Sequence, residues 1–288
     1  MDAMDRAARA GTTERPVWRA AQAESDFSAR SERDRVAVEE PLEIRVAGDA
    51  VATTLRTPGD DGKLAAGFLF AEGILRSARE LSSLSHCGRP GEGYGNVIDA
   101  RPSGGVVFDV ERTEPSRRGT LTTSACGVCG RRTVDDLLSR CAALPAGGGM
   151  PRGRLLACVA RLAPGQALFF HTGGTHSAAA FDAGGALLVQ HEDVGRHNAV
   201  DKVVGALLLD GRVGPDAPGP PPALLVVSGR ASFEVVQKAA MARIPVVASV
   251  SAASSLAIDL AQRVGITLAA FVREARLNVY TCPERLEA

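Results

Sequence analysis

Apolar and polar positions follow their most regular pattern in the last third of the chain. Three short aliphatic runs, each the length of a β-strand, are separated by two longer segments in which apolar residues recur with helical spacing. Aliphatic strands that alternate with helices are typical of a buried parallel sheet built from right-handed crossovers. The pattern predicts strands over residues 223–227, 244–250 and 266–272, and helices over 233–242 and 255–264.

The middle of the chain predicts an antiparallel pair of strands and a long helix. The turn between the two strands is Asp182-Ala183-Gly184-Gly185, which has the residue types of a hairpin turn. Polar, glycine-rich blocks lie before and after the hairpin, at 172–177 and 191–198, and ligand-binding loops have this character. The predicted elements are strands over 178–181 and 186–190 and a helix over 199–209.

A smaller unit with mixed strand and helix patterns precedes these elements. Leu64, Phe68 and Leu69 share one face of a predicted helix, and the turn at Gly48-Asp49 joins two predicted strands. The predicted elements are strands over 36–46 and 51–56, a helix over 63–72 that residues 57–61 cap and Gly73 ends, and short strands with glycine turns over 84–110.

The first 35 residues mix charges of both signs and contain few aliphatic side chains. Such a composition predicts a disordered leader, in which the lone tryptophan, Trp18, is a stray aromatic residue rather than a partner-binding anchor. The expected organisation is a leader over 1–35, a small α+β domain over 36–116, a mobile cysteine loop over 117–132 and a larger α/β domain over 133–288.

Composition narrows the classes of function. The 33 basic side chains balance 33 acidic ones, which argues against a nucleic-acid-binding protein, because such proteins carry a basic excess. No apolar run approaches the length of a membrane span, and the N-terminus lacks the apolar stretch of a signal peptide. We therefore expect a cytoplasmic protein whose six cysteines are mostly free thiols.

The clearest candidate for chemistry is the pair Cys126 and Cys129 in the run Thr122-Thr123-Ser124-Ala125-Cys126-Gly127-Val128-Cys129-Gly130. Small hydroxylated residues and two glycines suit an accessible loop. Four nearby arginines favour the thiolate, which is the reactive and metal-binding form of cysteine. The spacing alone fits half a zinc site, a dithiol redox couple, a persulfide carrier or an incidental pair.

The other cysteines carry weaker signals. Cys141 continues the apolar face of a helix predicted to begin at Thr133, and Cys158 lies in an apolar run, so both are predicted to be core residues. Cys87 follows His86, but two ligand types without a second pair indicate ordinary side chains rather than a metal site. Cys282 has no predicted role.

A second candidate site follows from the predicted sheet. The loops after its three strands contain Ser228-Gly229-Arg230, residues 249–255, and Arg273-Glu274-Ala275-Arg276. Ligands of open α/β sheets bind outside the carboxyl ends of the strands, and arginines with backbone and hydroxyl donors suit phosphate or a nucleotide. Neither a GxGxxG motif nor a P-loop is present, and solvated surface arginines are the plain alternative.

Several long sequence motifs together resemble those of the FdhD family, the sulfur carrier proteins of formate dehydrogenase maturation. The resemblance extends from about Val38 to the C-terminus. It is carried by Glu39-Glu40-Pro41-Leu42, Thr57-Pro58-Gly59-Asp60, Gly67-Phe68-Leu69 with Glu72-Gly73-Ile74, Cys126-Gly127-Val128-Cys129-Gly130, Thr172-Gly173-Gly174-Thr175-His176, Glu192-Asp193-Val194-Gly195-Arg196-His197-Asn198-Ala199 with Asp201-Lys202, and Ser228-Gly229-Arg230.

The resemblance implies a mechanism and a fold. A cysteine desulfurase would give sulfane sulfur to the cysteine loop, and the carrier would pass it to the molybdenum bis(guanine dinucleotide) cofactor, bound as cargo, for a formate dehydrogenase. The family fold is a cytidine-deaminase-like, three-layer α/β domain with a mostly parallel sheet beside a small N-terminal α+β domain, in a homodimer. Cys126 would bear the persulfide, with Cys129 as its neighbour.

The resemblance also assigns cofactor-binding residues, namely Phe271, Val272, Arg273, Glu274, Ala275 and Arg276. We add Arg230 from the physical argument on the sheet edge. Thr123-Ser124-Ala125 replaces the serine run that is usual in the family, which should not alter the sulfur chemistry.

Two other classes of function stay open at this point. One is a cofactor chaperone that does not need its thiols. The other is a zinc-dependent nucleotide hydrolase, for which metal analysis should find about one zinc per chain. Zinc deaminases need an H-x-E or C-x-E triplet before P-C-x-x-C, and this chain has neither the triplet before Cys126 nor a proline at position 125. We therefore expect no zinc and no other metal site.

Overall fold

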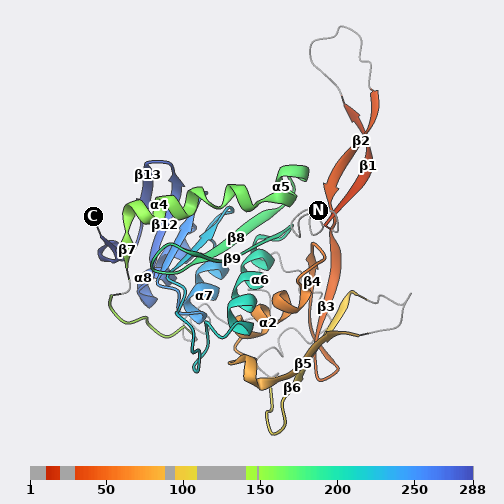
Figure 1. Cartoon of the computed structure of the whole chain (residues 1–288), viewed down its shortest axis with the longest axis horizontal. Coiled ribbons are helices and arrows are strands. Elements are labelled where there is room, and N and C mark those ends of the chain that lie inside the picture. Colours follow the sequence, from red (N-terminus) through yellow and green to blue (C-terminus); the bar gives the residue numbers. More distant parts are fainter. Residues whose placement is uncertain (1–10, 20–29, 88–94, 109–140, 148, 288) are drawn as a thin grey trace.

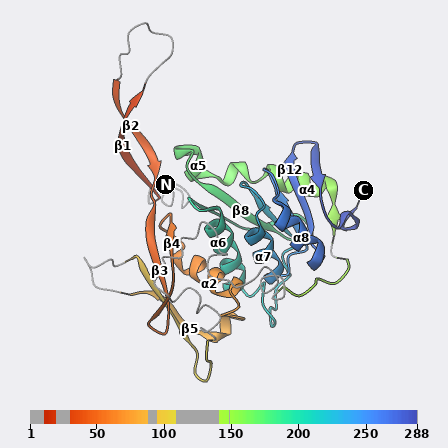
Figure 2. The same ribbon diagram turned by 180° about the vertical axis from the view of Figure 1, so that it is seen from behind.

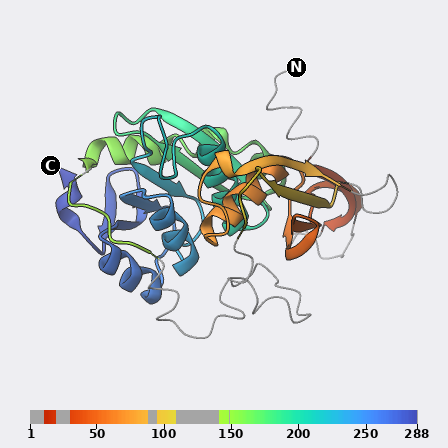
Figure 3. The same cartoon turned by 90° about the horizontal axis from the view of Figure 1, so that it is seen from below.

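A computed structural model describes residues 11–19, 30–87, 95–108, 141–147 and 149–287. A larger α/β unit, built from residues after 149, lies beside a smaller unit built from residues 40–102 (Figure 1; Figure 3). Among the described residues, every helix is too short or too polar to cross a membrane.

The larger unit is built on a six-stranded mixed sheet with the order β13-β12-β11-β10-β8-β9. β9, β10, β11 and β12 run in one direction and β8 and β13 in the other, so two of the five neighbouring pairings are parallel and three are antiparallel. The prediction of a mostly parallel sheet holds for the direction of four of the six strands, but the sheet is mixed, because β8 and β13 run against their neighbours. The strands are β8 (His176–Phe181), β9 (Leu187–Asp193), β10 (Leu224–Val227), β11 (Val246–Ser249), β12 (Thr267–Arg273) and β13 (Arg276–Val279).

Helices cover both faces of this sheet. Leu224 and Val226 of β10 face a core shared with α4, whereas Leu225 and Val227 face the core of α6, α7 and α8. This alternation is the period of two expected for a strand buried on both sides. The helices of this unit are α4 (Arg152–Ala160), α5 (Ala167–Thr172), α6 (Arg196–Leu209), α7 (Phe233–Met241) and α8 (Ser255–Val264).

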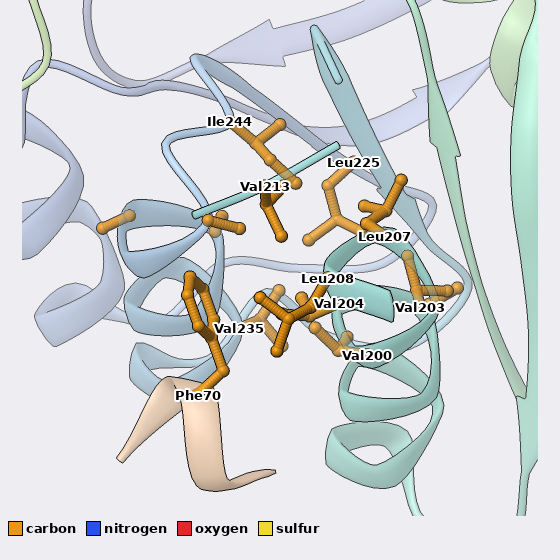
Figure 4. Packing of buried hydrophobic residues seen from close by; sticks show 14 of the residues in the cluster. Phe70, Val200, Val203, Val204, Leu207, Leu208, Val213, Leu225, Val235 and Ile244 are labelled. Carbon is orange, nitrogen blue, oxygen red and sulfur yellow. The ribbon is translucent and has the colours of Figure 1, made fainter. Parts of the chain in front are cut away.

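The core on the α6 and α7 side is dense and aliphatic. Figure 4 shows Val200, Val204 and Leu208 of α6 pointing toward Val235 of α7 and Phe70. All five side chains are buried. Phe70 comes from the smaller unit, so one continuous core joins the two units.

The smaller unit is a four-stranded sheet, in the order β4-β3-β6-β5, with the α-helix α2. Helix α2 packs on α6, and its Gly67 and the Gly205 of α6 lie where the two backbones touch. A Cβ at either glycine would overlap backbone atoms of the other helix. The elements are β3 (Glu40–Val46), β4 (Asp49–Arg56), α2 (Asp61–Ala71), η1 (Ala78–Glu80), β5 (Leu81–His86) and β6 (Val97–Pro102).

The N-terminal leader contains regular structure that composition did not predict. Thr12–Arg19 (β1) and Arg30–Ala37 (β2) pair as an antiparallel hairpin that extends away from the body of the protein (Figure 2). The prediction of disorder is wrong for these residues. A ladder of backbone hydrogen bonds stabilises the pair, and backbone pairing does not require the apolar side chains on which the prediction relied.

Two shorter features complete the described chain. β7 (Met150–Pro151) pairs with β14 (Leu286–Glu287), which ties the end of the chain to the start of α4. The turns η3 (Ala163–Gly165) and η4 (Pro283–Arg285) are 3-10 helices. The predicted helix from Thr133 lies outside the described residues.

Candidate functional site

The loops after β10, β11 and β12 meet at one edge of the sheet, as their sequence positions predict. The Ser249 hydroxyl donates to the Gly229 carbonyl at 2.8 Å, and the Phe271 amide donates to the Ser251 carbonyl at 2.9 Å. Each loop is thus bonded to the next one. The structure brings Arg230, the segment 249–255 and the segment 271–276 to the same edge of the sheet.

Strand β8 adds residues to this edge, because it runs antiparallel to β10 and begins where β10 ends. The Ser177 amide donates to the Ser228 hydroxyl at 2.9 Å. A Cβ on Gly229 would lie 3.1 Å from His176 Nδ1 and 3.4 Å from the Arg196 Cβ. His176 and Arg196 therefore lie against the loop that carries Arg230.

The edge is locally basic although the chain has no net charge. Burial lowers the pKa of His176, and the charges of Arg196, His197 and Arg230 lower it further. Arg196 Nε is a buried donor that has no hydrogen-bond partner among the described residues. A buried donor without a partner is costly, and an anionic oxygen at this position would relieve that cost.

Three helices also begin at this edge, and each points its positive end toward it. The N-cap residues of α6, α7 and α8 are Gly195, Ser232 and Ser254, and none of them makes a side-chain capping hydrogen bond. The first amides of an uncapped helix are donors for an anion, and the helix dipole favours negative charge there. The edge is therefore suited to phosphate groups.

The segment from Phe271 to Arg276 forms the end of β12 and the turn into β13. Phe271 and Glu274 have positive φ angles of 52° and 39°, conformations that are strained for residues other than glycine. Val272 is 1% exposed and belongs to the core shared with α4, so its side chain is not available to a ligand. The side chains of Phe271, Arg273, Glu274, Ala275 and Arg276 are exposed.

The polar block 191–198 has a different role from the one predicted. It comprises the end of β9 and the first turn of α6, and Asp193, His197 and Asn198 are buried. Asn198 donates to the Leu55 carbonyl at 2.7 Å, which ties α6 to the smaller unit. Most of this block is structural, and Arg196 is its contribution to the basic edge.

The turn before α2 also differs from the prediction. Asp60 is the N-cap residue, but its side chain makes no capping hydrogen bond. Its carboxylate instead pairs with Lys63 at 2.8 Å and with His191 at 3.2 Å. The predicted helix is correct and its N-cap residue lies within the predicted 57–61, but Asp60, which has a left-handed backbone, does not cap the helix through its side chain.

Cys126 and Cys129 lie outside the described residues, so their geometry stays a prediction. Cys141 and Cys158 are buried, which confirms their assignment to the core. Among the residues that the structure describes, no three His, Cys, Asp or Glu side chains gather as a metal site requires. The expectation that the chain holds no zinc stays a prediction.

A cavity of about 960 Å³ lies at the opposite edge of the sheet, before β10 and β11. Its lining is mainly apolar, and Arg212 and Arg243 contribute to it. None of the predicted site residues that the structure describes lines it. We therefore place the candidate site at the carboxyl edge, where the arginines, helix N-termini and predicted residues converge.

Sequence reasoning missed His176 and Arg196 as members of this edge. Their nearness to Arg230 depends on β8 pairing antiparallel with β10, which is a long-range contact. The only signal was their place in the glycine-rich blocks on either side of the hairpin. The site and fold together define a mixed α/β protein with a basic edge that is suited to anions.

Comparison with known proteins assigns the chain to a family. A sequence model of the FdhD/NarQ family matches residues 37–287, and the chain belongs to this family. A sulfur carrier protein FdhD from Anaeromyxobacter sp. (strain K) is 58% identical over 256 residues, which cover 88% of this chain and 89% of the relative. The Mycobacterium tuberculosis sulfur carrier protein FdhD is 45% identical over 265 residues, covering 88% of this chain and 92% of the relative.

A solved structure agrees with the fold. It is the crystal structure of a proposed formate dehydrogenase accessory protein from Desulfotalea psychrophila, which is 26% identical to this chain. The superposition has a TM-score of 0.72 and covers 96% of this chain and 99% of the other. The resemblance inferred from the sequence motifs is thereby confirmed at the level of the family.

Proposed function

We propose that this protein is a sulfur carrier that accepts sulfur from a cysteine desulfurase and transfers it to the molybdenum bis(guanine dinucleotide) cofactor of a formate dehydrogenase. Membership of the family and the names of its relatives support the carrier role. The carboxyl edge carries the cofactor part of the proposal, because its arginines and helix N-termini suit the phosphates of a guanine dinucleotide. The cytidine-deaminase-like fold, the homodimer and the cytoplasmic location belong to the same proposal.

The sulfur step uses Cys126. Its thiolate attacks the sulfane sulfur of the desulfurase persulfide, a new S–S bond forms on Cys126, and the desulfurase cysteine leaves as a thiolate. Release of the sulfur as sulfide needs two electrons. The thiols of Cys126 and Cys129 together supply these electrons. The Cys129 thiolate attacks the Cys126 sulfur, a Cys126–Cys129 disulfide forms, and hydrosulfide leaves.

Intact-mass measurement after incubation with a cysteine desulfurase and cysteine tests the sulfur step. We expect a gain of one sulfur atom that a reductant removes. The gain should be absent in Cys126→Ala and present in Cys87→Ala, a matched change at a partly exposed cysteine outside the loop. No gain in the wild type, with an active desulfurase, would exclude the carrier mechanism.

A cofactor chaperone that does not use its thiols is the second candidate. The observation in its favour is that the basic edge contains no cysteine among the described residues. It predicts normal formate dehydrogenase maturation in a strain that carries only Cys126→Ala. The carrier mechanism predicts loss of maturation in the same strain, with unchanged guanine-nucleotide binding by the purified variant.

A further inference from the structure

The hydroxyl of Ser232, the N-cap residue of α7, is directed away from its own helix. An N-cap serine usually accepts a hydrogen bond from an amide in the first turn, but Ser232 makes no such bond. Its Oγ instead lies 3.0 Å from Nε2 of His197 on α6. The backbone amides in the first turn of α7 are therefore not bonded by the Ser232 side chain. The Ser232 hydroxyl instead has the imidazole of His197 as its partner.

His197 is held by a carboxylate on its other ring nitrogen. Its Nδ1 lies 2.7 Å from Oε2 of Glu234, and both side chains are about nine-tenths buried. Burial raises the pKa of Glu234, but the hydrogen bond from His197 and the charges of His197, Lys238 and Arg196 outweigh it and lower that pKa overall. An ionised Glu234 can accept from Nδ1–H, and in that tautomer of His197 the Nε2 atom can accept from Ser232.

The three residues thus form a chain of nucleophile, base and orienting carboxylate. A serine becomes nucleophilic when a neighbouring imidazole can take its proton and a third group fixes the tautomer of that imidazole. Ser232 is half-buried, whereas the base and the carboxylate are buried. Amides at the start of a helix are suitable donors to an oxyanion.

The surroundings indicate the kind of substrate. Arg230 is exposed two residues before Ser232, and Arg196 precedes His197 on α6. Both guanidinium groups belong to the basic edge described above. A substrate with an anionic group beside its reactive carbonyl would be attracted to this position.

We propose that Ser232, His197 and Glu234 form a second catalytic site, which hydrolyses carboxylic esters that bear a negative charge. The Ser232 oxygen attacks the ester carbonyl and its proton passes to His197 Nε2. The C–O bond to the alcohol breaks, the alcohol leaves with that proton, and an acyl-Ser232 remains. Water, deprotonated by the same imidazole, then releases the carboxylic acid. No oxidant, reductant or cysteine takes part.

A fluorophosphonate probe tests the nucleophile without knowledge of the natural substrate. The Ser232 oxygen should bond to phosphorus as fluoride leaves, which adds one adduct mass to the peptide that contains Ser232. Labelling should be absent in Ser232→Ala and in the heat-denatured wild type. It should persist in Ser77→Ala, a matched N-cap serine on the exposed η1 turn. An unlabelled wild type, or labelling that survives in Ser232→Ala, overturns the proposal.

His197 and Glu234 are buried, so they need substitutions that preserve the size of the side chain. His197→Gln and Glu234→Gln retain hydrogen-bonding side chains, and their melting temperatures show whether they fold. In folded variants, labelling should be lost in His197→Gln and slowed at least about tenfold in Glu234→Gln. Wild-type labelling rates in folded His197→Gln would overturn the role of the imidazole as the base.

A conservative variant separates a positioning role of Glu234 from a structural one. Glu234→Asp keeps a carboxylate that can accept from Nδ1 of His197, whereas Glu234→Gln does not. Labelling should therefore be faster in folded Glu234→Asp than in folded Glu234→Gln. Equal labelling rates in the two folded variants would contradict the role of Glu234.

Two chromogenic esters test the substrate class. Hydrolysis of 4-nitrophenyl succinate should exceed that of neutral 4-nitrophenyl acetate in the wild type. Arg230→Ala should remove this preference, and Arg212→Ala, at the cavity on the opposite edge, should retain it. Equal rates for both esters in wild type and variant would overturn the assignment of an anionic substrate.

Discussion

The carboxylate of Asp193 lies 2.8 Å from the ammonium group of Lys202, and both side chains are almost completely buried. The ammonium also donates to the Thr57 carbonyl at 2.9 Å, while the carboxylate accepts from the Thr57 amide at 3.2 Å. The pair therefore holds both backbone groups of Thr57, which follows β4 of the smaller unit. This buried clamp connects the two units beside their shared apolar core.

Removing one partner of this clamp should be strongly destabilising. Lys202→Met leaves the Asp193 carboxylate buried without its counter-ion, which typically costs about 3–5 kcal/mol. We expect the free energy of unfolding in urea to fall by roughly this amount. Arg33→Met, which breaks the exposed pair with Glu14, should change it by less than about 1 kcal/mol. Similar losses in both variants would contradict the role of burial.

The contact between α2 and α6 requires glycine on both helices. A methyl group at Gly205 would overlap the Lys63 carbonyl, which belongs to backbone and cannot rotate away. We expect Gly205→Ala to lower the free energy of unfolding by about 1–3 kcal/mol or more. Gly153→Ala in α4 is the matched control, because its Cβ would meet nothing within 4 Å. The control should be neutral or stabilising by up to about 1 kcal/mol, since alanine favours the helix.

The buried pair of Asp201 and Lys238 should make stability depend on pH. Burial outweighs the attraction of Lys238, 2.6 Å away, and raises the pKa of Asp201 to about 6 from its ordinary value of 3.8. A raised pKa means that the folded state keeps the proton longer than the unfolded state. The contribution of Asp201 is therefore fully present below about pH 4 and is lost as pH rises to about 6.

Urea unfolding between pH 4 and pH 7 measures this contribution. The stability of the wild type relative to Asp201→Asn should fall by up to roughly 3 kcal/mol from pH 4 to pH 6 and then level off. The Asp201→Asn variant should be less stable overall, because Lys238 loses its charged partner. Its free energy of unfolding should not show the fall between pH 4 and pH 6. Parallel curves for the two proteins would contradict the raised pKa.

Guanine-nucleotide binding should depend on the basic edge. Arg230→Ala and Arg196→Met each remove a donor to phosphate, and hydrogen bonds to charged groups contribute about 1.5–3 kcal/mol. We expect at least about tenfold weaker binding of GDP by calorimetry for each variant. Arg212→Ala, at the cavity on the opposite edge, should bind GDP as the wild type does. Weaker binding in the control alone would move the nucleotide site to that cavity.

Much of the larger unit was predictable from local pattern. The helix expected over 255–264 is α8, and the strand expected over 223–227 is β10, because continuous aliphatic runs and helical spacing are properties of single segments. The loops at the carboxyl ends followed from strand direction. Strand order was not predictable, because nothing local states that β8 pairs with β10 or that the two strands run antiparallel.

The sequence by itself determined the family, the central strands and helices of the larger unit, the buried positions of Cys141 and Cys158, and the loop that carries Arg230. Tertiary structure alone decided that His176 and Arg196 join that loop, that Asp193 and Lys202 are a clamp, and that Ser232 meets His197. The physical reason is the range of the interactions. Periodicity and turn chemistry act within a segment, whereas the basic edge and the buried polar pairs arise only when strands and helices distant in sequence pack together.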